Sequence, residues 1–95
     1  MNNERITILQ NAILQFGQDR QIEMAVEEMG ELLAAINKCK RGRCSVSAVQ
    51  EEIADVKIMM GQLAIIFGED GVSSFERLKL RRLADRIIKQ AHKVK

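Results

Sequence analysis

Apolar residues recur at helical spacing along most of the chain, and short glycine-containing segments interrupt this pattern. The spacing predicts helices from about Glu4 to Phe16, from an N-cap near Asp19 to about Lys40, from a cap at Ser45 or Ser47 to about Phe67, and from a cap at Ser73 or Ser74 nearly to the C-terminal end. Gly17, Gly42 and the segment 68–71 separate these helices. The chain shows no strand-like alternation, so we expect one all-α, four-helix domain over residues 1–95.

The second predicted helix carries its acidic residues on two different faces. A strict apolar seam is formed by Ile22, Val26, Met29, Leu33 and Ile36. Glu23 and Glu27 fall in a polar strip, so we expect them to be solvated. Glu28 and Glu31 lie nearly opposite the seam, on a face that they share with apolar residues, namely Met24, Leu32 and Ala35.

The third predicted helix is apolar on most of its sides. Glu52 and Asp55 share one face with apolar residues, namely Ala48, Val56, Met59, Leu63 and Ile66. Two further faces are also apolar, and they are formed by Ile53, Met60, Ala64 and Phe67 and by Ile58 and Ile65. Such a helix must be buried on most sides, which a monomer of 95 residues can hardly achieve. We therefore expect a homo-oligomeric bundle, either a homodimer or a homotetramer.

Two acidic pairs, Glu28-x-x-Glu31 and Glu52-x-x-Asp55, have the same spacing. A three-residue step along an α-helix turns by about 300°, so each pair points to one side of its helix. If the two helices pack antiparallel, the four carboxylates converge, and they repel one another unless a cation neutralises them. Oxygen-only ligands suit Mg²⁺ or Mn²⁺, and Mg²⁺ sites commonly act on phosphate substrates. The pairs predict such a site; the alternative is that they are ordinary glutamates on helix surfaces.

The segments around these acids resemble the MazG-type all-α nucleoside triphosphate pyrophosphohydrolases. That family is marked by Glu-x-x-Glu, a spacer of variable length, and Glu-x-x-Asp. The motif is matched by Glu27-Glu28-Met29-Gly30-Glu31-Leu32 and by Glu51-Glu52-Ile53-Ala54-Asp55-Val56, with twenty residues between Glu31 and Glu52. Phe16-Gly17-Gln18 and Gln21 are also similar. The resemblance covers residues 16–67 well and the C-terminal helix loosely.

This resemblance implies a four-helix fold, assembled as a dimer or a dimer of dimers, in which Glu28, Glu31, Glu52 and Asp55 hold Mg²⁺. The implied reaction cleaves a canonical or modified (deoxy)nucleoside triphosphate between its α and β phosphates, giving the monophosphate and pyrophosphate. Glu31 or Glu28 is the expected proton acceptor for the attacking water. The chain has no Trp or Tyr, so the residues predict neither the preferred base nor the preferred sugar.

Basic residues are concentrated near the C-terminal end. Residues 76–95 carry 8 basic and 2 acidic side chains, against 7 and 11 in residues 1–75. A ridge at helical spacing is formed by Lys79, Arg82, Arg86, Lys89 and Lys93. The resemblance implies that Lys79, Arg82 and Arg86 bind substrate phosphates, while a solvated cationic face explains them equally well. The ridge also leaves open a nucleic-acid-binding module, although the absence of a recognition-helix pattern disfavours it. A third alternative is a catalytically inactive protein of the same fold.

Cys39 and Cys44 lie in a basic connection with Lys38, Lys40, Arg41 and Arg43. Their spacing is not that of a zinc site, and the single histidine, His92, is far away. We expect two free thiols, as in a reducing cytosol, and cations that remain in solvent. The N-terminal segment lacks the apolar core of a signal peptide, and no apolar run reaches membrane-spanning length. These features predict a soluble cytoplasmic protein that does not bind a membrane.

Overall fold

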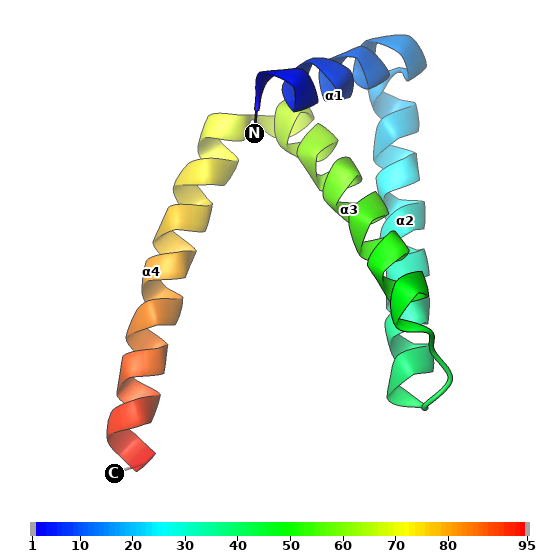
Figure 1. Cartoon of the computed structure of the whole chain (residues 1–95). Helices are drawn as coiled ribbons and strands as arrows, with labels where there is room; N and C mark the ends of the chain where they lie inside the picture. The colour runs from blue at the N-terminus through cyan, green and yellow to red at the C-terminus, as the bar shows by residue number, and fades with distance from the viewer. Residues whose placement is uncertain (1, 95) are drawn as a thin grey trace.

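The computed structural model describes residues 2–94, and these residues form four α-helices and no β-strand. In chain order the helices are α1 (Asn3–Phe16), α2 (Gln18–Lys40), α3 (Val46–Phe67) and α4 (Glu69–Val94) (Figure 1). The all-α prediction is therefore confirmed, and the first three helices begin and end close to their predicted bounds. No described helix is both long enough and apolar enough to span a bilayer.

Polar side chains cap two of the helices at their N-termini. The Asn2 side chain accepts a hydrogen bond of 2.7 Å from a backbone N–H in the first turn of α1. Ser45, one of the two caps that the sequence predicted, caps α3 in the same way, at 3.1 Å. The expected cap at Asp19 is wrong, because Gly17 ends α1 and α2 begins at Gln18. Asp19 lies in the first turn of α2, where its negative charge is favourable for the helix dipole.

The last helix begins earlier than the sequence predicted. The expected cap at Ser73 or Ser74 is wrong, because α4 begins at Glu69. Gly68 makes the whole turn with a φ of 109°, a conformation that side-chain-bearing residues rarely adopt. Gly71, which was expected to extend the break, lies inside the helix. One glycine therefore separates α3 from α4.

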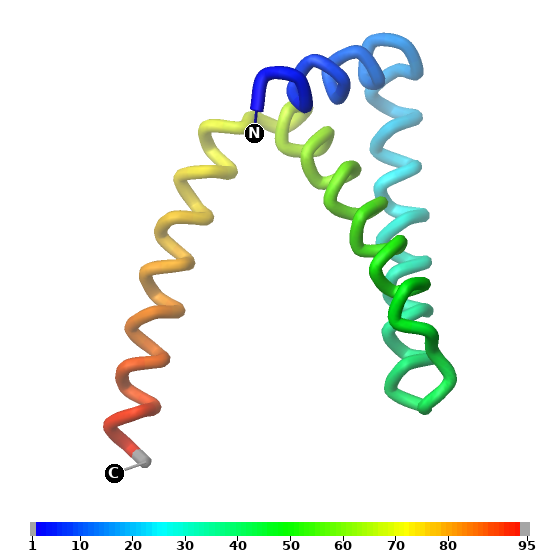
Figure 2. The backbone as a smooth tube through the Cα atoms, in the orientation of Figure 1, coloured from blue at the N-terminus to red at the C-terminus, as the bar shows by residue number. Residues whose placement is uncertain are grey.

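α2 and α3 form an antiparallel hairpin that contains the most extensive packing in the described chain (Figure 1). α1 lies across the end of the hairpin where α2 begins and α3 ends. The Arg5 guanidinium donates a hydrogen bond of 3.2 Å to the Lys57 carbonyl oxygen, which ties α1 to α3. α4 starts at this same end and extends away from the hairpin (Figure 2). The hairpin is thus the part of the fold that positions facing side chains.

A buried pair of glutamines fixes how α2 and α3 pair. Gln21 Nε2 donates a hydrogen bond of 2.7 Å to Gln62 Oε1. The two side chains are only 7% and 4% exposed, respectively. The buried hydrophobic residues in the described chain are Leu9, Ala25 and Met59. In so small a core, a satisfied amide pair contributes noticeably to stability.

We expect Gln62→Ala to lower the free energy of unfolding by about 1–3 kcal/mol, because it leaves the Gln21 amide buried without a partner. Gln50→Ala changes an exposed glutamine on the same helix, and it should alter stability by less than about 0.5 kcal/mol. Urea denaturation followed by circular dichroism measures both variants. Equal losses of stability in the two would show that the buried amide pair has no special role.

α4 and one face of α2 have no cover within the single chain. All residues from 71 to 93 are exposed. The Cα radius of gyration is 16.9 Å, whereas a compact domain of this length has about 12 Å. On the apolar seam of α2, Val26 is 62% and Leu33 is 60% exposed, because the opposite face, which carries Glu28, packs toward α3. One chain therefore leaves long apolar helix faces open.

Candidate functional site

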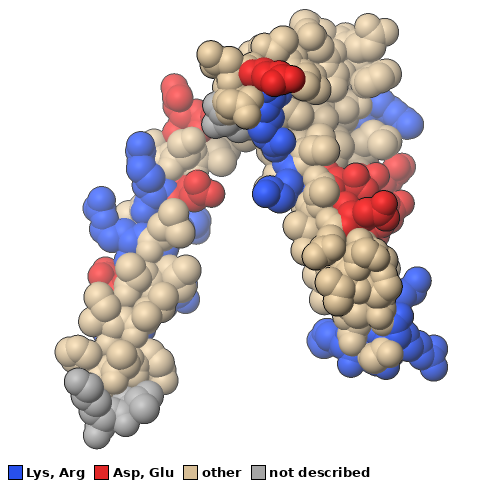
Figure 3. All heavy atoms as spheres, viewed as in Figure 1, with Lys and Arg blue, Asp and Glu red and all other residues tan. Residues whose placement is uncertain are grey.

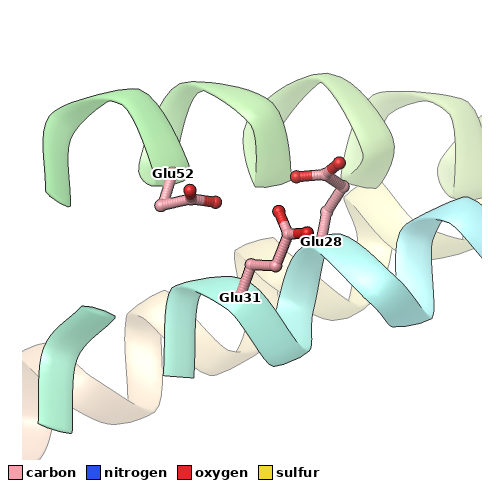
Figure 4. A group of neighbouring side chains, drawn as sticks. All are labelled: Glu28, Glu31 and Glu52. Carbon is pink, nitrogen blue, oxygen red and sulfur yellow. The ribbon is translucent and has the colours of Figure 1, made fainter. Parts of the chain in front are cut away.

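α2 and α3 bring three of the predicted acidic residues together. Glu28 and Glu31 project from α2, and Glu52 faces them from α3 (Figure 4). One carboxylate oxygen from each residue lies within 4.8 Å of those from the other two. Acidic side chains gather over this part of the hairpin in the space-filling view (Figure 3). The convergence expected from antiparallel packing is observed for these three residues, which we call the acidic cluster.

Two carboxylates of the acidic cluster are partly buried. Glu28 and Glu52 have intermediate exposure, whereas Glu31 is exposed. The Oε2 atoms of Glu28 and Glu52 are almost inaccessible to solvent, and neither has a hydrogen-bond partner among the described residues. A buried carboxylate oxygen without a partner is costly in free energy. A cation bound between the two helices would supply the missing partner to both oxygens.

The same surroundings disfavour the ionised form of these two acids. Burial raises the pKa of the Glu28 carboxyl above its ordinary value of 4.5, and the negative charges of Glu31 and Asp55 raise it further. Burial is also the main cause of the raised pKa of Glu52, followed by the charges of Glu31 and Asp55. All the neighbouring charges that raise the pKa values of Glu28 and Glu52 are negative. The cluster therefore has the electrostatic character of a cation site.

The fourth predicted acid, Asp55, borders the acidic cluster. It is exposed and lies one turn along α3 from Glu52. It does not belong to the set whose oxygens meet within 4.8 Å. Its charge still acts on the cluster, because it follows burial and Glu31 among the causes that raise the pKa of Glu28 and Glu52. Asp55 is thus close enough to act on a bound cation electrostatically.

The donor set of the acidic cluster fits a hard divalent cation. All three side chains offer carboxylate oxygens, which Mg²⁺ and Mn²⁺ prefer. One oxygen of each carboxylate lies within 4.8 Å of those of the other two, so one cation could contact all three after the side chains move closer together. A cation would also give a partner to the two unpaired buried oxygens of Glu28 and Glu52. The residues present therefore match the predicted metal.

We expect Glu28→Gln to stabilise the metal-free protein at neutral pH. The raised pKa values of Glu28 and Glu52 mean that the folded chain binds protons more tightly than the unfolded chain. Their contribution to stability is therefore complete below pH 4.5 and is lost as the pH rises through the raised values. Glutamine imitates the protonated carboxyl, so the advantage of the variant should shrink on acidification toward pH 4.5.

Thermal unfolding in EDTA, over a series of pH values, measures this difference. Glu27→Gln is the matched control, because Glu27 is the exposed neighbour on the same helix. Saturating Mg²⁺ should reverse the order and make the wild type the more stable protein, since a bound cation stabilises the folded state. A wild type that is as stable as Glu28→Gln in EDTA at neutral pH would contradict the electrostatic description of the cluster.

A groove of about 390 Å³ runs from the acidic cluster to the turn between α2 and α3. Small side chains from both helices, Ala34, Ala35 and Ala48, leave this space open. Its lining also includes Glu31 and Glu52 together with Lys38 and Arg43. Lys38 and Arg43 are exposed, as expected, but they line the same groove as the acids. Cations and carboxylates therefore border one groove.

The sequence contained a signal for one of these two cations. Lys38 follows Glu31 by seven positions, which is about two helical turns and returns to the same face. That spacing identifies Lys38 as a neighbour of the acidic pair along α2. Arg43 lies in the turn after α2, so helical periodicity does not place it. Its position depends on how the turn folds.

The prediction of two free thiols in this turn is wrong. Cys39 and Cys44 form a disulfide, with their Cα atoms 4.4 Å apart. Gly42, with a φ of 74°, lets the chain reverse between the two cysteines. Sequence spacing could not show this reversal, because disulfide formation depends on the distance between Cα atoms. The bond also removes one reason for the cytoplasmic prediction, since disulfides persist mainly in oxidising compartments.

The phosphate-binding residues predicted on the last helix lie apart from the acidic cluster within one chain. Lys79, Arg82 and Arg86 line a separate hollow on α4, together with Asp85 and Lys89. α4 extends away from the hairpin, and its basic side chains are exposed (Figure 3). In this arrangement the cations of α4 do not meet the acidic cluster of the same chain.

Comparisons with known proteins leave the geometry as the basis for assigning a function. No protein-family model matches the chain, and no significant similarity links it to a curated protein or a solved structure. The likeness to the MazG-type motif therefore remains a resemblance of residues. What the chain does must be inferred from the acidic cluster and the groove beside it.

Proposed function

We propose that the protein is a Mg²⁺-dependent nucleoside triphosphate pyrophosphohydrolase. The observation that carries this proposal is that Glu28 on α2 and Glu52 on α3 each have a buried carboxylate oxygen without a hydrogen-bond partner among the described residues. Glu28, Glu31 and Glu52 would hold the cation, with Asp55 beside them, and Mn²⁺ could replace Mg²⁺. The MazG-type spacing of the acids supports the choice of reaction.

The exposure of the acidic residues suggests which of them would accept the proton of the attacking water. When bound, Mg²⁺ neutralises phosphate oxygens and lowers the pKa of a coordinated water. Glu31 is the exposed member of the acidic cluster, so it is the preferred proton acceptor for the attacking water. Glu28 is the less suitable of the two candidates, because one of its oxygens is buried. The products would be the nucleoside monophosphate and pyrophosphate.

Assembly of two or more copies is part of the proposal. Val26 and Leu33 on α2 and Ile87 on α4 are each at least 60% exposed in one chain. Extended apolar faces of this kind mark protein interfaces. A homodimer, or a tetramer of two dimers, would cover them. Such an assembly would also bring α4 of one chain near the hairpin of another, where Lys79, Arg82 and Arg86 could contact phosphates.

The basic face of α4 supports a second candidate, a nucleic-acid-binding function. Lys79, Arg82, Arg86 and Lys89 line one exposed hollow, and clustered cations are sufficient for contacts with a phosphate backbone. Asp85 lies in the same hollow and weakens its attraction for a polyanion. This candidate also leaves the acidic cluster without a purpose, so we rank it second.

Product analysis distinguishes the two candidates. The protein is incubated with each common ribonucleoside and deoxyribonucleoside triphosphate in the presence of Mg²⁺, and the products are separated by ion-exchange chromatography. We expect equal amounts of monophosphate and pyrophosphate from at least one nucleotide, and no product in EDTA. No product from any nucleotide, together with salt-sensitive binding to DNA or RNA, would favour the second candidate.

A further inference from the structure

We propose that the turn between α2 and α3 forms a diphosphate subsite, in which Lys38 and Arg43 bind the β and γ phosphates of a triphosphate. This inference rests on the proposed function, and it assigns residues to the part of the substrate that leaves as pyrophosphate. The subsite belongs to the same chain as the acidic cluster. It is distinct from the cationic hollow on α4.

The two ends of the groove carry opposite charges, which sets the orientation in which a triphosphate would bind. Glu31 and Glu52 lie at the end nearest the acidic cluster, and Lys38 and Arg43 lie toward the turn. A triphosphate that places its α phosphate at a cation held by the acidic cluster can therefore extend its other two phosphates along the groove. The alanines in the lining leave room for these groups without offering a competing charge.

The cations at the turn have the chemistry that a diphosphate needs. An arginine guanidinium can donate two parallel hydrogen bonds to phosphate oxygens, and a lysine ammonium supplies a compact positive charge. Ser45 and Ala48, at the beginning of α3, line the same end of the groove. The N-terminus of a helix carries partial positive charge, which adds to the attraction for an anion.

The disulfide positions the two cations. The Cys39–Cys44 bond closes the turn, with Cys39 next to Lys38 and Cys44 next to Arg43 in the chain, and Cys44 itself lines the groove. Closing the turn limits the conformations of these two residues before a ligand arrives. Preorganisation of this kind lowers the entropy lost on binding. Cys39 and Cys44 are therefore positioning residues in the proposed subsite.

The acids at the other end make the subsite dependent on a divalent cation. Without a cation, the charges of Glu31 and Glu52 repel a diphosphate in the same groove. With Mg²⁺ at the acidic cluster, that repulsion is replaced by attraction. Pyrophosphate should therefore bind tightly only when Mg²⁺ is present.

Isothermal titration of the full chain with inorganic pyrophosphate, at saturating Mg²⁺, tests the subsite. Lys38→Gln/Arg43→Gln should weaken pyrophosphate binding by about tenfold or more, because two charge-assisted contacts are lost. Its affinity for a nucleoside monophosphate should stay unchanged, since a monophosphate places no group at the turn. Lys40→Gln/Arg41→Gln is the matched control, because it removes the same charge from the same turn but from residues that do not line the groove.

Equal loss of pyrophosphate affinity in the two double variants would overturn the subsite, because general attraction to a basic turn would then explain binding. Cys39→Ser/Cys44→Ser should weaken pyrophosphate binding less than Lys38→Gln/Arg43→Gln does, with the helical circular dichroism spectrum retained. Unchanged affinity in that variant would overturn the positioning role of the disulfide.

The titration also separates failure of the subsite from failure of the proposed function. If nucleotides are hydrolysed but Lys38→Gln/Arg43→Gln binds pyrophosphate as the wild type does, the subsite is wrong and the function stands. If pyrophosphate binding depends on Lys38 and Arg43 but no nucleotide is hydrolysed, the subsite stands and the function is wrong. If neither binding nor hydrolysis occurs, both are wrong.

Discussion

Glu52→Gln is expected to reduce the turnover of a nucleoside triphosphate by about 100-fold or more. Glu52 is the only member of the acidic cluster that comes from α3, and one of its carboxylate oxygens lies within 4.8 Å of oxygens from the two acids of α2. Glutamine keeps the shape of the side chain but removes the charge that a divalent cation requires. Initial rates of pyrophosphate release at saturating Mg²⁺ measure the loss.

The control for this variant is its neighbour. Glu51 is exposed on the same helix and lies outside the acidic cluster, so Glu51→Gln should keep turnover within about threefold of the wild type. Circular dichroism should show the same helical content in both variants. A Glu52→Gln protein that turns over nucleotide at the wild-type rate would show that the acidic cluster does not hold the catalytic cation.

Ile87→Asp on α4 is expected to separate the proposed homodimer into single chains. Ile87 is 60% exposed in one chain, and assembly would bury it. Loss of one buried apolar side chain in each of two chains removes about 3–6 kcal/mol, which raises the dissociation constant by about 100-fold or more. Sedimentation equilibrium over a range of protein concentrations measures this change.

The conservative substitution Ile87→Leu serves as the control, because it keeps the apolar volume at the same position. It should leave the assembly intact. If α4 of one chain supplies phosphate-binding cations to another, Ile87→Asp should also lower turnover at concentrations where the wild type is assembled. A wild-type chain that sediments as a monomer at every concentration would contradict the assembly.

Helical periodicity predicted the helices of this fold well, but it predicted poorly which helix faces pack together. It placed α1, α2 and α3 close to their observed bounds, because each has a regular apolar pattern and a glycine or a serine at its end. It placed the beginning of α4 too late. Gly68 alone is sufficient for the turn, so the following acidic residues begin the helix.

The faces of α2 show why the packing was harder to predict than the helices. The seam that includes Val26 and Leu33 is the most regular apolar pattern on α2, yet it lies exposed in one chain. The face that carries Glu28 packs toward α3 instead. Periodicity separates the faces of a helix, but it does not show whether the same chain or another copy covers each one.

The residues of the candidate site were likewise only partly predictable from the sequence. Glu28, Glu31 and Glu52 could be found from sequence, because a three-residue step and an antiparallel hairpin suffice to bring them together. Arg43 and the Cys39–Cys44 disulfide could not, since their positions depend on the reversal at Gly42. Local helical geometry was predictable, whereas the geometry of the turn was not.

Binding of Mn²⁺ to the acidic cluster can be measured without any substrate. In a titration of the wild type with Mn²⁺, the electron paramagnetic resonance signal of the free ion should stay low until at least one ion per chain is bound. Added Mg²⁺ should release the bound Mn²⁺, and Glu52→Gln should show almost no binding. A free-ion signal that grows from the first addition, as it does in buffer, would show that the buried oxygens of Glu28 and Glu52 do not form a cation site.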